Sequence, residues 1–144
     1  MSDIRSLEPL TLWNCFADLN AVPRPSKREE RVVAFVRAFA ERHDLTSLLD
    51  RAGNVIINKP ATPDKQDRPA VIMQAHLDMV HKAADGLKFD FDTQGIDMWA
   101  DGDWVRARGT TLGADNGLGV AAILAVLASK DISHPPIEAL FTLD

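Results

Sequence analysis

Hydrophobic residues recur at helical spacing in two segments near the start of the chain. In the first segment, which follows Pro9, the apolar side chains at positions 12, 13, 16 and 19 fall on one side of a helix. Residues 20–25 break this pattern, and Ser26 and Glu29 then have the spacing of a capping box. Apolar residues at positions 32, 33, 35, 36, 39 and 40 follow. The sequence therefore predicts a second helix that has Ser26 as its N-cap and runs to about His43.

Other segments have the composition of β-strands. Residues 46–51 and 54–59 predict two short strands joined around Gly53, and residues 137–143 predict another strand. The run at 70–80, AVIMQAHLDMV, starts as an apolar segment and predicts a buried central strand. Residues 98–100 and 104–107 flank Asp101 and Gly102, which is the pattern of a hairpin.

A third helix completes the predicted architecture. Residues 118–128 are apolar on every side, which is typical of a buried helix. Strands that alternate with helices predict an α/β fold with a mixed β-sheet flanked by helices. We expect the three helices to cover the faces of this sheet. The chain stops at Asp144, directly after an apolar strand, so residues 1–144 are expected to form a single partial domain.

Composition and charge narrow the class of protein. Of the 144 residues, 46% are hydrophobic and 26% are charged, as in ordinary globular domains. The net charge of -5 gives no reason to expect binding to nucleic acid or to an anionic membrane. The first residues lack the features of a signal peptide and no apolar run is long enough to span a bilayer, so a cytoplasmic location is expected. The single cysteine, Cys15, excludes an internal disulfide and is expected to be a small core residue.

Candidate chemistry begins at the end of the central strand. Because side chains alternate along a strand, Gln74, His76 and Asp78 are predicted to share one face. An imidazole there can bind a metal through one nitrogen while the neighbouring carboxylate orients the ring. On its own, the His-x-Asp pattern favours a hydrogen-bonded polar pair with no catalytic role.

A glycine-rich stretch favours the metal interpretation. Residues 108–119, RGTTLGADNGLG, hold one acid, Asp115, directly before the buried helix. Their spacing fits neither common phosphate-binding loop, and an acid in the loop would repel phosphate. A plain helix cap would explain Asp115 but not the glycines on both sides of it. A metal-ligating carboxylate in a tight turn explains both, and we expect His76 and Asp115 to face each other across a short gap.

These two motifs together resemble a known family. The residues His76-Leu-Asp78-Met-Val and the stretch 109–117, GTTLGADNG, resemble the M20 family of di-zinc metallopeptidases, and within it the aminoacyl-histidine dipeptidases. Residues 23–29, PRPSKRE, and 53–60, GNVIINKP, are also similar to that subfamily. The resemblance implies a metal-dependent enzyme that hydrolyses Xaa-His dipeptides, such as β-alanyl-histidine, through a water activated by two zinc ions. Cobalt or manganese would be possible substitutes for zinc.

The family motif also implies roles for particular residues. His76 would bind one zinc, Asp78 would be the catalytic residue that orients His76, and Asp115 would bridge both zincs, with a cis peptide bond between Asp115 and Asn116. In the family, a Glu-Glu pair that supplies the general base and a further ligand follows the strand similar to residues 137–144. We therefore expect the isolated 144 residues to be inactive, without the lid or dimerisation domain and the C-terminal part. The resemblance is compatible with a homodimeric complete enzyme.

Several alternatives stay open at this point. Another M20 aminopeptidase, tripeptidase or deacylase would carry the same two motifs, and a non-catalytic fragment that binds a partner or one weakly held metal would also fit. The remaining histidines are expected to be structural: His43 ends a predicted helix, His81 follows the motif in a loop, and His134 precedes two prolines.

Overall fold

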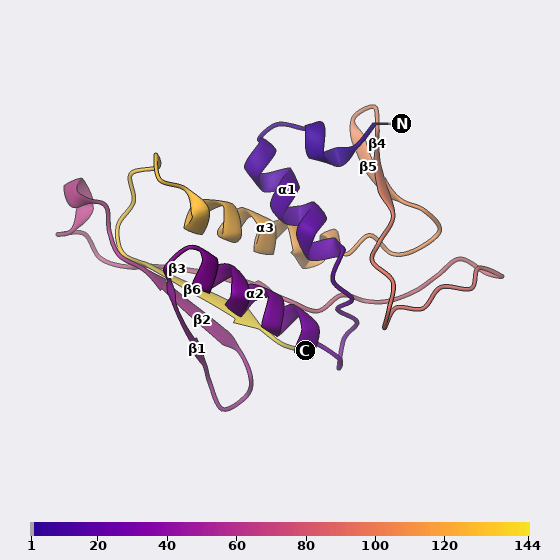
Figure 1. Cartoon of the computed structure of the whole chain (residues 1–144), viewed down its shortest axis with the longest axis horizontal. Coiled ribbons are helices and arrows are strands. Elements are labelled where there is room, and N and C mark those ends of the chain that lie inside the picture. The colour runs from indigo at the N-terminus through magenta and orange to yellow at the C-terminus, as the bar shows by residue number, and fades with distance from the viewer. Residues whose placement is uncertain (1) are drawn as a thin grey trace.

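The computed structural model describes residues 2–144, which form a four-stranded sheet, a two-stranded hairpin and three α-helices (Figure 1). The helices are α1 (Leu10–Asn20), α2 (Glu30–Arg42) and α3 (Ala114–Ala128), and short 3-10 turns occupy η1 (Ile4–Ser6) and η2 (Pro63–Lys65). The predicted α/β class is confirmed. No helix within residues 2–144 has the length and apolarity that a membrane crossing requires.

The main sheet is mixed, as predicted. Its strands lie in the order β1 (Thr46–Leu49), β2 (Val55–Lys59), β6 (Ile137–Thr142) and β3 (Val71–His76). The pairs β1–β2 and β2–β6 are antiparallel, whereas β3 and β6 are parallel. Parallel strands need a crossover connection, and α3 lies in the connection between β3 and β6. A crossover helix runs back along the sheet, so the start of α3 lies near the carboxyl end of β3.

The predicted hairpin is also present. Strand β4 (Met98–Asp101) pairs antiparallel with β5 (Trp104–Ala107) around Gly102, which has a positive φ of 60°. Ser2 forms a bridge with Ala100, so the hairpin lies beside the N-terminal end of the chain (Figure 1).

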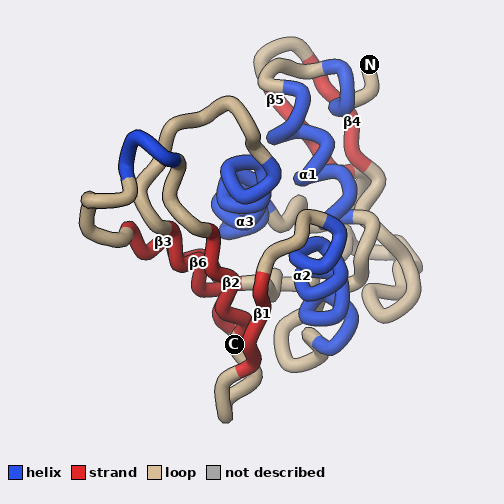
Figure 2. The backbone as a smooth tube through the Cα atoms, turned by 60° about the vertical axis from the view of Figure 1, so that its left-hand side comes forward, coloured by secondary structure: helices blue, strands red, loops and turns tan. Residues whose placement is uncertain are grey.

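The helices lie on one side of the main sheet, which corrects the expectation that they would cover both faces (Figure 2). Helices α2 and α3 contact the strands, and α1 packs on α3. On the other face of the sheet, Leu48 of β1 is 53% exposed and Ile72 of β3 is 65% exposed. The physical reason is that α2 and α3 already cover one face of the sheet, and α1 packs not on the strands but on α3, where it forms a second, smaller cluster of buried residues.

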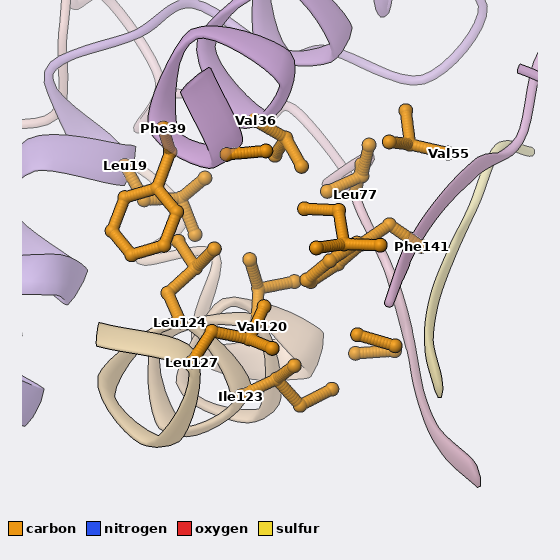
Figure 3. Packing of buried hydrophobic residues seen from close by; sticks show 14 of the residues in the cluster. Leu19, Val36, Phe39, Val55, Leu77, Val120, Ile123, Leu124, Leu127 and Phe141 are labelled. Carbon is orange, nitrogen blue, oxygen red and sulfur yellow. The ribbon is translucent and has the colours of Figure 1, made fainter. Parts of the chain in front are cut away.

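The main core fills the space between the helices and the sheet (Figure 3). Val36 and Phe39 of α2, Leu124 of α3 and Phe141 of β6 point into it from three directions. The side chain of Phe141 is fully buried. Burial alternates along β6, because every second side chain faces the helices, namely those of Ile137, Ala139 and Phe141.

The second helix begins at Glu30, later than the sequence predicted. Lys27 has a positive φ of 72°, so the chain turns before the helix starts, and Glu29 takes the N-cap position without a side-chain capping bond. The hydroxyl of Ser26 donates instead to the carboxylate of Asp78. The capping-box prediction was wrong because a distant partner replaced the local one.

Candidate metal centre

His76 is the last residue of β3, where the sheet edge opens to solvent. Its ring is held from one side by Asp78, whose Oδ1 lies 3.0 Å from His76 Nδ1. The backbone carbonyl of Asp78 lies 3.1 Å from the same nitrogen. The side chain of His76 is 37% exposed and that of Asp78 only 12%, so the supporting carboxylate is covered while the ring still reaches solvent.

Asp115 approaches the other side of the same ring. Its Oδ1 lies 3.1 Å from His76 Nε2, so the short gap that the sequence predicted is confirmed. The Asp115 side chain is 98% exposed. Asp115 lies within the first turn of α3, but it and Asn116 have non-helical backbone angles, and the peptide bond between them is cis, as the resemblance implied.

The charges around His76 change its protonation. Partial burial by itself lowers the pKa of His76, but the hydrogen bonds and charges of Asp115 and Asp78 more than offset this, and its pKa lies above the ordinary value. A ring that has a carboxylate oxygen at each nitrogen is stabilised in the doubly protonated form. A cation at Nε2 would replace one of those protons, because only the neutral imidazole is a metal ligand.

The donor set fits a divalent metal ion. Two ligand atoms at about 2.0–2.2 Å from one tetrahedral zinc lie roughly 3.4 Å apart, a few tenths of an ångström more than the 3.1 Å between His76 Nε2 and Asp115 Oδ1. Asp78 fixes the ring through Nδ1, which leaves Nε2 as the free ligand atom. Within residues 2–144 no group of three or more histidine, cysteine, aspartate or glutamate side chains is placed to hold a metal, and His76 and Asp115 are the pair of candidate ligands whose side chains meet.

Two residues at this site were missed by reasoning from the sequence. Ser26 donates to Asp78 Oδ2, the carboxylate oxygen that His76 does not use. Arg24 is 1% exposed and donates to the backbone carbonyls of Leu77 and Gly113, beside the two candidate ligands. Burial lowers the pKa of Arg24 to about 10, so the guanidinium stays charged at neutral pH. The available signal was the segment 23–29, PRPSKRE, which is similar to the dipeptidase subfamily, but its serine was assigned to a helix cap.

The other residues singled out from the sequence lie elsewhere. Cys15 lies partly buried in α1, and burial raises the pKa of its thiol to about 11. His43 follows α2, and its ring packs against the ring of Phe39. His81 makes an edge contact with Phe91. His134 is buried, with Nδ1 2.8 Å from the carbonyl of the next residue. None of these side chains joins His76 in the described hydrogen-bond network.

Known proteins share this sequence and fold. No family model matches the chain. The cytosol non-specific dipeptidase of Escherichia coli (strain K12) is 43% identical over 143 residues, which cover 99% of this chain and 30% of that protein. The crystal structure of aminoacylhistidine dipeptidase from Vibrio alginolyticus matches with a TM-score of 0.97 and 45% identity, over 99% of this chain and 29% of that one.

A more distant structure shares the fold alone. A Bacillus subtilis protein described as a dinuclear metal-binding peptidase of the M20 family matches with a TM-score of 0.56 and 17% identity, over 92% of this chain and 34% of that one. This chain thus spans about a third of the length of the proteins it matches.

Proposed function

We infer that this chain, whose sequence and fold match those of M20-family peptidases, carries a metal-holding part of a dipeptidase. The observation that supports this most directly is the 3.1 Å approach of His76 Nε2 to Asp115 Oδ1, with Asp78 on the opposite nitrogen of the ring. Imidazole and carboxylate groups that come from separate elements and meet at a solvent-exposed edge are a suitable donor set for a catalytic divalent ion.

Each of the three residues has its own proposed task. His76 and Asp115 would hold the metal, with zinc as the proposed ion and cobalt or manganese as substitutes. The bound metal would lower the pKa of a water molecule and polarise the scissile carbonyl. Asp78 accepts the Nδ1 proton of His76, which keeps the Nε2 lone pair directed at the metal and raises its basicity.

The proposed substrates are dipeptides, in particular those with a C-terminal histidine. The name of the Vibrio protein supports Xaa-His dipeptides, whereas the name of the E. coli protein supports a wider range of dipeptides. The E. coli name also supports a cytosolic location. A homodimeric complete enzyme is proposed from the sequence resemblance alone.

A chimera tests the proposed function. Residues 2–144 would replace the matching part of the E. coli dipeptidase, which is 43% identical to them. We expect the purified, zinc-loaded chimera to hydrolyse β-alanyl-histidine and to lose that activity on treatment with a chelator. In the same chimera, H76A should be inactive, and H43A should retain activity because His43 lies at the end of α2, outside the proposed site.

Two outcomes of the chimera experiment would count against the proposal or part of it. A folded chimera that is inactive on every dipeptide would contradict the proposal and favour a non-catalytic role. Equal turnover of dipeptides with and without a C-terminal histidine would support a dipeptidase but reject the narrower substrate class.

Ser26 offers a milder test of the support around His76. The S26A variant removes the hydroxyl that donates to Asp78 Oδ2. The carboxylate that orients His76 is then held by one hydrogen bond fewer. We expect zinc affinity, measured by calorimetry on the 144-residue chain, to fall about tenfold. The matched control is S133A, which removes a hydroxyl that donates to the exposed carboxylate of Asp64. Equal losses in both variants would rule out a specific role for Ser26.

A further inference from the structure

Arg24 contacts both segments that carry the candidate ligands. Its Nη1 donates to the carbonyl of Leu77 at 3.0 Å, between His76 and Asp78 in the chain. Its Nη2 donates to the carbonyl of Gly113 at 2.7 Å, two residues before Asp115. These two carbonyls come from elements far apart in the sequence, and one buried guanidinium joins them.

Asn20, at the end of α1, adds a further hydrogen bond to the glycine-rich stretch. Arg24 Nη2 donates to Asn20 Oδ1 at 2.7 Å, and Asn20 Nδ2 donates to the carbonyl of Leu112 at 2.8 Å. The carbonyls of two consecutive residues, Leu112 and Gly113, are therefore held by neighbouring side chains. Asn20 is 1% exposed, so water does not compete for these bonds.

The glycines on either side of Asp115 make room for the guanidinium. A Cβ atom at Gly113 or at Gly117 would lie 2.6 Å from Arg24 Nη2, closer than any real contact allows. Gly113 also has a positive φ of 71°, which side chains other than glycine rarely adopt. The close approach of Arg24 therefore gives a steric reason why residues 113 and 117 are both glycine.

The backbone of the same segment pairs with the residues after His76. The amide of Met79 donates to the carbonyl of Arg24 at 3.0 Å, and the amide of Ser26 donates to the carbonyl of Met79 at 3.2 Å. Pro25 and Met79 form an isolated parallel bridge. Residues 24–26 are thus fixed to the chain just beyond β3 by both side-chain and backbone bonds.

The geometry points to Arg24 as a positioning residue that holds the His76 segment and the Asp115 segment at the separation a shared metal ion requires. This inference rests on the proposed metal site, but its observations are independent of the metal. The planar guanidinium places two separate nitrogens, Nη1 and Nη2, in a fixed geometry toward the two carbonyls, whereas a lysine at the same place has a single donor nitrogen. Without the guanidinium, the direct side-chain bridge between the two segments that carry the candidate ligands would be lost.

A merely structural role for Arg24 is the competing explanation, so the test compares it with a second cation, the partly buried Lys59, which also donates to backbone carbonyls. Lys59 Nζ donates to the carbonyls of Val126 at 2.9 Å and Ser129 at 2.6 Å, at the far end of α3. K59M therefore removes bonds of similar kind from the same helix, away from the site. R24K and K59M would each be made in the 144-residue chain, and their folding checked by circular dichroism.

The first readout is amide hydrogen exchange in metal-free protein, followed by NMR. The amide of Met79 donates to the backbone carbonyl of Arg24, and the amide of Gly117 donates to the backbone carbonyl of Gly113. In R24K we expect both amides to exchange at least about tenfold faster, while amides of β2 change little. In K59M we expect faster exchange only near Ser129. A uniform acceleration in R24K, or none at Met79 and Gly117, would overturn the inference.

The second readout is zinc affinity by calorimetry. We expect R24K to bind zinc about 10–100-fold more weakly than the unmodified chain and K59M to bind within twofold of it. Equal affinities for R24K and the unmodified chain would overturn the inference. If the unmodified chain binds no zinc, the proposed metal function fails, while the exchange data still decide whether Arg24 holds the two segments together.

A second variant covers the case in which R24K does not fold. G117A keeps Arg24 but places a methyl group 2.6 Å from its Nη2 and 3.0 Å from the ring of Phe16. Alanine is a better helix former than glycine, so a helix without this contact would gain from the change. We expect G117A instead to weaken zinc binding by about tenfold. Unchanged zinc affinity in G117A would contradict the positioning role.

Discussion

Replacing His76 with alanine is expected to lower the zinc affinity of the 144-residue chain by at least about 100-fold. A four-ligand zinc site gains roughly 10–16 kcal/mol, or about 3 kcal/mol for each ligand, and His76 is the proposed imidazole ligand beside Asp115. Without the His76 imidazole, specific zinc binding is therefore expected to become too weak to measure. Calorimetric titration of both proteins with zinc at neutral pH measures the difference.

His81 provides the matched control for that experiment. It lies five residues further along the chain, is exposed, and contacts the ring of Phe91 rather than either candidate ligand. H81A should bind zinc as the unmodified chain does. If H81A loses as much affinity as H76A, the assignment of the imidazole ligand to His76 is wrong.

Replacing Phe141 with alanine is expected to lower the free energy of unfolding by about 3–5 kcal/mol. Phe141 is fully buried in β6, a central strand, and lies in the core between Val55 of β2 and Ala75 of β3. Its removal leaves a cavity that β2 and β3, held in register by β6, cannot collapse to fill. Single domains are stable by only about 5–15 kcal/mol, so this one change removes much of the margin. Urea unfolding followed by circular dichroism measures it.

The comparison variant is I72A, on the neighbouring strand. Ile72 is 65% exposed on the open face of the sheet, so its removal should change the free energy of unfolding by less than about 1 kcal/mol. A similar loss in I72A and F141A would mean that the open face is covered in solution, and that the core does not lie on the helical side alone.

The sequence by itself determined the elements of this protein. The apolar run at 137–143 predicts β6, and the helical spacing predicts most of α1 and α2, because these patterns arise from interactions between near neighbours in the chain. The same reasoning placed His76 at the end of a strand and Asp115 at the start of a helix. Because a crossover helix begins near the end of the preceding parallel strand, their approach could also be predicted.

The support of His76 by Asp78 was also predicted from the sequence, but only the tertiary structure decided which residues hold Asp78 and the glycine-rich stretch in place. Ser26 has the local pattern of a helix cap, yet its hydroxyl is bonded to Asp78, 52 residues away. Arg24 reaches Leu77 across 53 residues and Gly113 across 89. In the sequence it looks like an ordinary surface charge. A buried cation is acceptable only where several carbonyls converge on it, and that convergence exists only once β3, α1 and the glycine-rich stretch have packed together.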